Sequence, residues 1–410
     1  MPIRGDRIVA DIEAIARFTA TPGAGSDRPT FSAAWRQARD HVLAEAERAG
    51  CHWRIDAAGN VHIRPRGVSW SRRVWLSGSH LDSVPGGGDF DGVVGVVAAL
   101  EVLRAAHEAG RHDLPLEAVV FAEEEGTTFG LGMLGSRGWI GTLDAAALAG
   151  VRNRHGKNYW EAGADQGASA ERLAADRLRP ADYAGLIELH IEQGPAMWKH
   201  DHRVALVTAI AGRRQYAVVL RGVANHAGST GMDDRHDALA GAAEVIAAVE
   251  CLPDLLGDHA VATVGRIAVE PNAVNVIPSR AEFTVDLRAP DDDSLELGDE
   301  RLRALVAAAA QRRGLEHEIV RTESLPAVRL DGPLADRVRT AAGGLGLAPL
   351  AETVSGALHD AAILAPLVPT VMIFVASRDG ISHNPAEFSR IDDIATATRL
   401  LAAVVDADPA

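Results

Sequence analysis

The chain has 410 residues, of which 47% are hydrophobic and 24% are charged, a composition typical of a globular protein with a large core. Its formal net charge of −15 and its pI near 5.5 exclude binding to nucleic acid or to anionic membranes through its overall field. The two cysteines, Cys51 and Cys251, exclude a disulfide framework, and no stretch reaches the roughly 20 apolar residues of a membrane span.

The first residues predict a helix and not a targeting signal. Residues 1–18 carry Asp6, Asp11 and Glu13 among apolar side chains, which is typical of an amphipathic helix. Together with the scarcity of cysteine, this predicts a protein of the reducing cytoplasm.

Strand-like and helix-like segments alternate through the first half of the chain. Residues 72–80, 116–126 and 186–194 are apolar runs that end in polar residues, as strands do where they enter loops. Residues 92–110 have apolar side chains at helical spacing and a terminal glycine. This order predicts an α/β domain with a mixed, mainly parallel sheet covered by helices.

The pattern changes after Gly212. Residues 212–325 follow the order β-α-β-β-α-β, which is typical of a ferredoxin-like α+β domain. The chain then returns to α/β character, with residues 369–380 as a buried strand. We therefore expect one α/β domain formed by residues 1–211 and 326–410, with residues 212–325 inserted into it.

Residues able to bind metal ions follow several of the apolar runs. They are His80, Asp91, the Glu124–Glu125 pair, His190 and His383. Side chains at the carboxyl ends of strands point into the crevice above an α/β sheet, where ligands bind. Three imidazoles and two carboxylates satisfy two closely spaced divalent ions if one carboxylate bridges them. The sequence therefore predicts a dinuclear metallohydrolase.

Each of these residues also has a simpler explanation when taken alone. Asp91 could cap a helix after a glycine-rich turn, Glu123 to Glu125 could form a surface acidic turn, and His190 could be an ordinary core histidine. A catalytically inactive binding or scaffold protein of the same fold is an alternative of a different class. The combined set argues against it, because an uncompensated carboxylate cluster is costly to retain.

Several segments, in order from about residue 6 to about residue 400, resemble the N-carbamoyl-L-amino-acid hydrolase and allantoate amidohydrolase family. That family belongs to the aminoacylase-like dinuclear metallopeptidase superfamily. The combination is specific although no single motif is. The segments are GSHLDSVPGGGDFDG, EEEG, ELHIEQGP, ANHAGSTGMDDRHDAL, EPNAVNVIPSRAEFTVDLR, SGALHDA and GISHNP.

The resemblance implies a ligand set for two divalent ions per subunit, with zinc expected and manganese or cobalt as alternatives. One ion would be held by His80, Asp91 and His190. The other would be held by Asp91, Glu125 and His383, with Asp91 bridging. Glu124 would be the general base for a metal-activated water, and Asp82 would orient His80.

The resemblance also implies residues for the substrate. Gln193 would face a ureido group, and Asn275 and Arg288 would bind the substrate carboxylate, a task that suits the planar fork of an arginine. His226 would stabilise the oxyanion in the partner subunit of a homodimer. Residues 1–211 and 326–410 would then be the catalytic domain, and residues 212–325 a dimerisation or lid domain.

The implied reaction is cleavage of the carbamoyl C–N bond of an N-carbamoyl-L-amino acid or a related ureido carboxylate. Allantoate amidohydrolase activity is one alternative, and dipeptidase or N-acyl amino acid hydrolase activity is another. Three places depart from the family pattern: Thr127–Thr128, Gly231 and Leu358 stand where Arg, Pro and Gly are usual. None of these positions belongs to the metal ligands, but they leave the side chain of the substrate undetermined.

Overall fold

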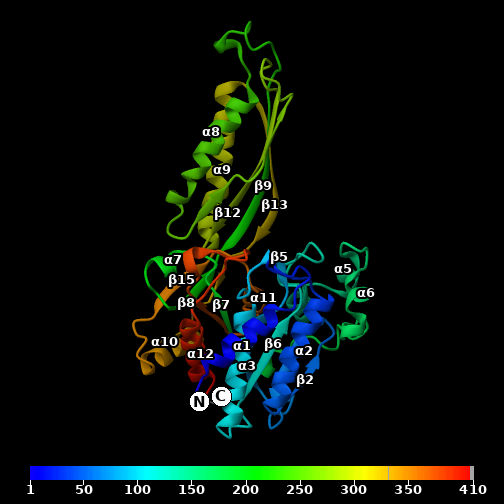
Figure 1. The fold of residues 1–410 in the computed structure, drawn as a ribbon. Coiled ribbons are helices and arrows are strands. Elements are labelled where there is room, and N and C mark those ends of the chain that lie inside the picture. The colour runs from blue at the N-terminus through cyan, green and yellow to red at the C-terminus, as the bar shows by residue number, and fades with distance from the viewer. Residues whose placement is uncertain (331, 407–410) are drawn as a thin grey trace. The chain divides into compact units, whose positions relative to one another are not determined.

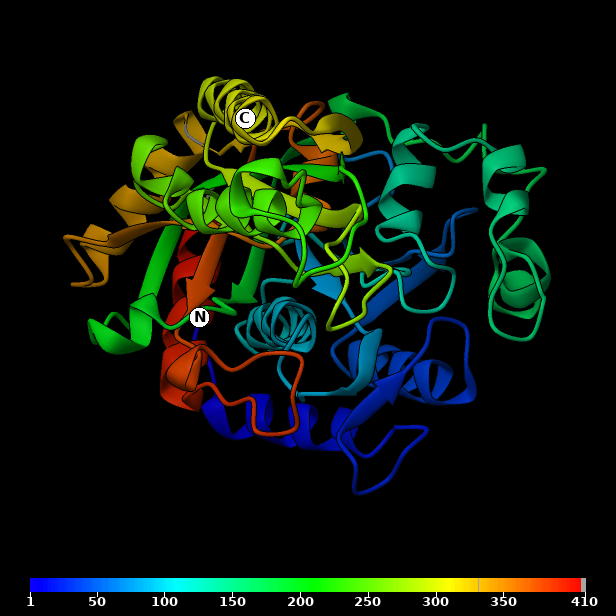
Figure 2. The same cartoon turned by 90° about the horizontal axis from the view of Figure 1, so that it is seen from above.

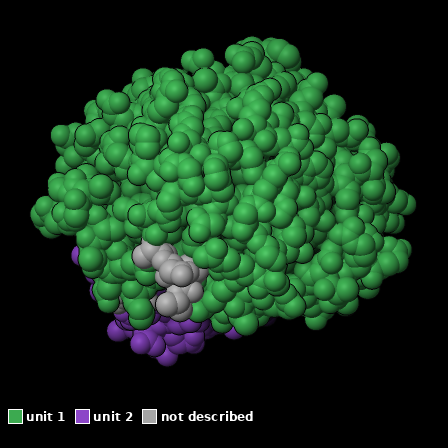
Figure 3. Space-filling model, turned by 90° about the horizontal axis from the view of Figure 1, so that it is seen from below, with its two compact units in different colours: residues 1–208, 330–353, 359–410 green, residues 209–329, 354–358 purple. Residues whose placement is uncertain are grey.

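The computed structural model describes residues 1–330 and 332–406, and the chain divides into two compact units (Figures 1 and 3). The first unit consists of Met1–Thr208, Leu330–Thr353 and His359–Ala410, and the second consists of Ala209–Arg329 and Val354–Leu358. The segment Val354–Leu358 is thus part of the second unit, whereas the sequence-based prediction assigned residues 326–410 to the α/β domain.

The first unit is built on a mixed sheet whose four central strands are parallel. The order is β8-β16-β7-β4-β6-β3-β2, with parallel pairing from β16 through β7 and β4 to β6 and antiparallel pairing at both flanks. The predicted α/β class is confirmed. The strands are β2 (Cys51–Ile55), β3 (Val61–Pro65), β4 (Val74–His80), β6 (Leu116–Phe121), β7 (Tyr183–Ile191), β8 (Val204–Ile210) and β16 (Thr370–Val375). Short strands β14 (Val328–Arg329) and β15 (Ala351–Ser355) pair with β8, and β1 (Ser26–Arg28) pairs with β5 (Ser83–Gly87).

Helix α3 (Val93–Glu108) is the central helix of the first unit and lies near the middle of Figure 2. It contacts strands β4, β6 and β7 on one side and helices α1 (Gly5–Ala16), α2 (Ala33–Arg48) and α12 (Ile391–Val405) on others. Its residues from Val93 to Ala106 are all buried. Burial on every side explains why its sequence is apolar around the whole helix and not along one stripe.

The remaining helices of the first unit are shorter. They are α4 (Leu134–Ile140), α5 (Ala145–Gly150), α6 (Tyr159–Gly163), α7 (Ala196–Lys199), α10 (Pro333–Gly344) and α11 (Asp360–Leu364). Among the described residues, no helix is both long and apolar enough to cross a membrane.

The second unit has the element order β-α-β-β-β-α-β, which is the ferredoxin-like pattern with one edge strand divided into β10 and β11, since both pair with β12. Its elements are β9 (Gly212–Arg221), α8 (Ala238–Glu250), β10 (Val261–Thr263), β11 (Ile267–Glu270), β12 (Arg280–Ala289), α9 (Asp292–Arg313) and β13 (Glu316–Leu325). The sheet order is β10-β12-β9-β13, every pairing is antiparallel, and β11 also pairs with β12. Alternate residues of β12 are buried, because both helices pack on the same face.

A buried ionic cluster joins β3 to β6 and β7 in the first unit. His62 Nδ1 lies 2.7 Å from Glu117 Oε1, and Tyr183 donates a hydrogen bond of 3.0 Å to the same oxygen. Arg64 Nε donates to the other oxygen of Glu117. Burial opposes the charge of both partners, yet their attraction raises the pKa of His62 and lowers the pKa of Glu117. Glu117 is therefore the counter-charge of two buried cations.

We expect Glu117→Gln to lower the free energy of unfolding by about 3 kcal/mol or more, because it removes the buried carboxylate paired with Arg64 and leaves His62 with Asp56 alone, 3.2 Å from its Nε2. Urea denaturation would measure this. The matched control is Glu108→Gln, which removes the half-exposed partner of Arg7 and should cost less than about 1 kcal/mol. Equal losses in the two variants would contradict the ionised cluster.

Candidate metal centre

The candidate ligands meet at one edge of the first unit's sheet. His80 is the last residue of β4, the Glu123–Glu125 turn follows β6, and His190 is the penultimate residue of β7. Asp91 lies just before α3, and His383 lies on the loop after β16. Because β4, β6, β7 and β16 are parallel, their carboxyl ends point to the same side and bring these residues together.

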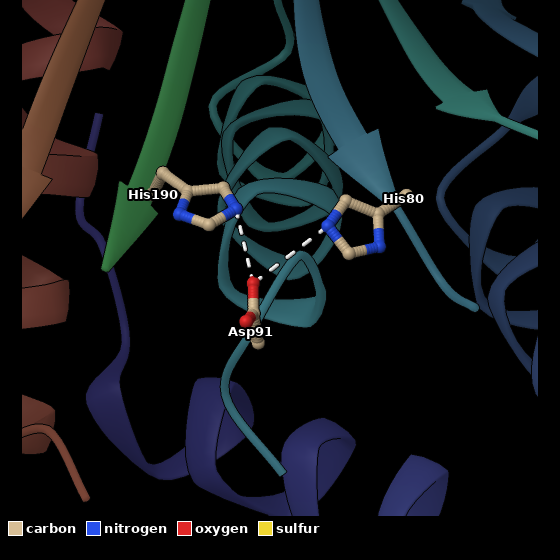
Figure 4. Close-up of side chains that lie close together, drawn as sticks. All are labelled: His80, Asp91 and His190. Carbon is tan, nitrogen blue, oxygen red and sulfur yellow. Dashed lines mark ion pairs between the residues drawn. The ribbon is translucent and has the colours of Figure 1, made fainter. Parts of the chain in front are cut away.

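Asp91 is the residue that the other ligands share. Its Oδ1 lies 3.2 Å from His190 Nε2 and 3.7 Å from His80 Nε2, as Figure 4 shows. Its Oδ2 lies 3.2 Å from His383 Nε2, which is also 3.5 Å from Glu125 Oε2. The two oxygens of one carboxylate thus face two different groups of ligand atoms, the arrangement that a bridge between two ions requires.

Each of these two groups is compact enough for one ion. In His80–Asp91–His190, and likewise in Asp91–Glu125–His383, the ligand atoms lie within 4.8 Å of one another. Glu124 stands beside both groups, with its Oε2 3.6 Å from His80 Nε2. A carboxylate adjacent to the ligands, and not needed to complete either group, is suitably placed to exchange protons with a bound water.

Main-chain carbonyls orient two of the imidazoles. His80 Nδ1 lies 2.9 Å from the carbonyl oxygen of Asp82, and His190 Nδ1 lies 3.0 Å from that of Ile191. A carbonyl only accepts hydrogen bonds, so each Nδ1 carries the proton and each Nε2 offers its lone pair to the centre. The Asp82 carboxylate is 3.8 Å from His80 Nδ1, and its Oδ2 accepts a 3.0 Å hydrogen bond from the Glu125 amide.

The electrostatics of the cluster call for cations. Burial raises the pKa of Glu124 well above its ordinary value, and repulsion from Glu125 adds to this. Burial and the Asp91 charge raise the pKa of Glu125 in the same way. For Asp91, burial is outweighed by His190 and His383, which hold its pKa well below the usual range. Metal ions would allow the whole set to ionise.

Two buried atoms support the same conclusion. His190 Nε2 and Glu125 Oε1 have no hydrogen-bond partner among the described residues, although both are buried. Buried polar atoms are normally satisfied, so the lack of a protein partner at these two atoms fits a role as metal ligands. Imidazole nitrogens with carboxylate oxygens suit zinc, manganese or cobalt.

The backbone is adapted to the site. Glu123, Gln193 and His383 have φ values of 58°, 59° and 54°, in the left-handed region that residues other than glycine rarely occupy. Such conformations cost about 1–3 kcal/mol each and concentrate at functional sites. Gly92, with φ 67°, is needed for another reason: a Cβ there would collide with the ring of His80.

Three buried residues next to the ligands had no role predicted from the sequence. Glu188 accepts hydrogen bonds from the Ser79 hydroxyl at 2.8 Å and from the Ala361 amide at 3.0 Å. His359 stacks edge-on against His190, with ring centroids 4.5 Å apart, and Asp360 accepts a hydrogen bond from Ser136. A signal for Glu188 existed, since it precedes His190 by two residues and so shares its face of the strand.

The expected substrate residues are divided between the two units. Gln193 belongs to the first, where its Nε2 donates a 2.7 Å hydrogen bond to Asp91 Oδ2. His226 and Asn275 belong to the second and are exposed. Arg288 is also in the second, where it donates to Asp286 Oδ1 at 2.9 Å and to the Gly356 carbonyl at 2.7 Å.

Comparison with known proteins places the chain in a family. The model of peptidase family M20/M25/M40 matches residues 76–407. The chain is 37% identical to an N-carbamoyl-L-amino acid amidohydrolase of Geobacillus stearothermophilus, covering 97% of each chain. It is 33% identical to an allantoate amidohydrolase of Bacillus subtilis, covering 95% of this chain and 94% of the relative.

A solved structure gives the same assignment. A hydantoinase/carbamoylase family amidase from Burkholderia multivorans superposes with a TM-score of 0.90 at 35% identity, covering 98% of this chain and 97% of the other. The likeness therefore extends over both units. The chain belongs to peptidase family M20/M25/M40.

Proposed function

We propose that the protein is a metal-dependent amidohydrolase that cleaves the carbamoyl C–N bond of N-carbamoyl-L-amino acids or of a related ureido carboxylate. The observation that carries this proposal is the position of Asp91, whose two oxygens face two ligand groups, with Glu124 beside them. The relatives named as N-carbamoyl-L-amino acid and allantoate amidohydrolases support a C–N bond outside a peptide as the target.

Two divalent ions held by these groups would supply an activated water and a Lewis acid for the substrate carbonyl. Glu124 accepts the proton of the attacking water and later returns it to the leaving nitrogen. Its pKa, raised by burial and by Glu125, suits an acid–base group that must hold a proton between the two steps. The histidines and Asp91 keep the reacting atoms in place.

The substrate carboxylate is the proposed partner of Arg288 and Asn275. Two of the guanidinium nitrogens of Arg288 already donate hydrogen bonds, one to Asp286 and one to the Gly356 carbonyl. These two bonds fix the plane of the guanidinium group. Gln193 is placed beside Asp91 and is proposed to contact the ureido group. His226 is proposed to stabilise the oxyanion from the partner subunit of a homodimer.

Allantoate is the second candidate substrate, because an allantoate amidohydrolase also aligns over nearly the whole chain. It carries a ureido group beside a carboxylate, so the same residues would recognise it. The two possibilities differ in the group on the α carbon and not in the bond that is cleaved.

A substrate panel tests the proposal. Metal-reconstituted protein should release ammonia from N-carbamoyl-L-amino acids or allantoate, and it should be inactive on the matching amides that lack the carboxylate. Acyl amino acids and dipeptides serve as controls. Faster release of amine from these two classes than of ammonia from any ureido compound would overturn the assignment.

Two neighbouring carboxylates should separate metal binding from turnover. Asp91→Ala should lose bound metal and activity together, because both ligand groups share this side chain. Glu124→Gln should retain metal but lose about 10² or more in kcat, because the amide cannot accept the proton. Elemental analysis and steady-state kinetics measure the two effects. Full metal occupancy in Asp91→Ala would refute the bridging role.

A mixing experiment tests whether His226 acts across a dimer. Inactive His226→Ala and inactive Glu124→Gln would be combined under conditions of subunit exchange. If His226 acts in the partner's site, each mixed dimer has one intact site and one doubly defective site, and about a quarter of the wild-type rate returns on random mixing of a two-fold dimer. No recovery after confirmed exchange would show that His226 acts within its own subunit or not at all.

A further inference from the structure

Glu387 is a buried carboxylate that connects the loop carrying Asp91 to the loop carrying His383. It is 5% exposed and lies four residues after His383. Its Oε1 accepts hydrogen bonds from the main-chain amides of Phe90 at 2.9 Å and Asp91 at 3.0 Å. One side chain thereby satisfies two consecutive amides at the point where the shared carboxylate leaves the backbone.

The second oxygen of Glu387 reaches the other loop. Its Oε2 lies 2.9 Å from the Ser382 hydroxyl, which is also 3.1 Å from Asp91 Oδ2. Ser382 immediately precedes His383. The amide of Glu387 in turn donates a 2.9 Å hydrogen bond to the Asn384 carbonyl, which closes the loop into a tight turn. The two ligands are therefore linked through Glu387 and Ser382.

The glycine run before Asp91 packs against the side chain of Glu387. A Cβ at Gly88 would overlap the Glu387 carboxylate, so the glycine run before Asp91 passes directly against it. Residues 88–92 and 382–387 have no regular structure of their own to hold them, whereas His80 and His190 lie on paired strands. The position of Asp91 relative to His383 therefore depends on the hydrogen bonds through Glu387 and Ser382, together with the one from Gln193 to Asp91 Oδ2.

We propose that Glu387 is a positioning residue that sets the spacing of Asp91 and His383 and thus tunes the affinity for the ion of the Asp91–Glu125–His383 group. This inference rests on the proposed dinuclear centre. Glu387 is not itself assigned as a ligand, because both of its oxygens are occupied by donors from the protein. The His80–Asp91–His190 group depends on it less, since two of its three members are fixed by the sheet.

The test is a calorimetric titration of the metal-free full-length protein with Co²⁺. Wild type should bind two ions. Glu387→Ala should weaken one of the two binding events by about 10- to 100-fold, the range for loss of a residue that orients a ligand, and leave the other within about threefold. Glu387→Asp, which is one methylene too short to reach both loops, should behave like the alanine variant.

Glu387→Gln is the rescue variant. Its amide oxygen still accepts from the Phe90 and Asp91 amides, and its amide nitrogen still reaches Ser382, so both affinities should stay near wild type. Glu101→Ala is the matched control, because Glu101 is also fully buried and accepts a main-chain hydrogen bond, from Arg4 at 2.8 Å. It should lower the thermal midpoint without changing either affinity for Co²⁺.

The possible outcomes separate this inference from the function it rests on. Wild-type protein that binds fewer than two ions refutes the dinuclear centre and the role of Glu387 with it. Two outcomes would refute the role of Glu387 and leave the dinuclear centre standing. In one, Glu387→Ala binds both ions with wild-type affinity. In the other, the affinities for both ions fall by the same factor. If the alanine variant does not fold, the comparison of Glu387→Asp with Glu387→Gln decides, since both retain a polar side chain at this position.

Discussion

Burial of several carboxylates at one edge of a parallel sheet is the constraint on which the rest of this structure depends. Asp82, Asp91 and the Glu123–Glu125 turn all lie within or beside the cluster, and Glu387 adds a further acidic group. Like charges in a poorly solvated space hold protons unless cations are supplied. Three imidazoles lie among these carboxylates, and main-chain amides donate hydrogen bonds to Asp82, Glu123 and Glu387. These amides fix the geometry, and the remaining negative charge is what two divalent ions would neutralise.

The sequence indicated that the candidate ligands would lie near one another, because their signal is local. An apolar run followed by a histidine or an acidic residue marks a strand end, and parallel strands place their carboxyl ends together. His80, the Glu124–Glu125 pair and His190 follow this rule directly. The α/β class and the element order of the second unit were predictable for the same reason, since alternation of strand and helix is a property of neighbouring residues.

The features that the sequence did not predict depend on contacts between distant residues. No local pattern shows that Glu387 accepts from the amides of Phe90 and Asp91, which lie about 300 residues earlier. The place of Val354–Leu358 in the second unit, where Gly356 accepts from Arg288, is equally non-local. The mixed sheet was predicted, but the sequence did not show that β8 and β3 would be the antiparallel strands beside the parallel core, because a strand's sequence does not specify its partner's direction.

The two units also differ in how firmly their functional residues are held. Two of the candidate ligands, His80 and His190, lie at strand ends and are oriented by buried hydrogen bonds, so the sheet sets their geometry. Asp91 and His383 lie on loops, and His383 is exposed. In the second unit, His226 and Asn275 are exposed, and they lie between β9 and β12 and not within either strand. Loops accept substitutions more readily than paired strands do. The N-carbamoyl-L-amino acid and allantoate amidohydrolases are both similar to this chain over nearly its whole length, so relatives with different named substrates share one fold. In the proposed function, the reaction depends on the sheet edge of the first unit, whereas the substrate contacts are divided between Gln193 of the first unit and His226, Asn275 and Arg288 of the second.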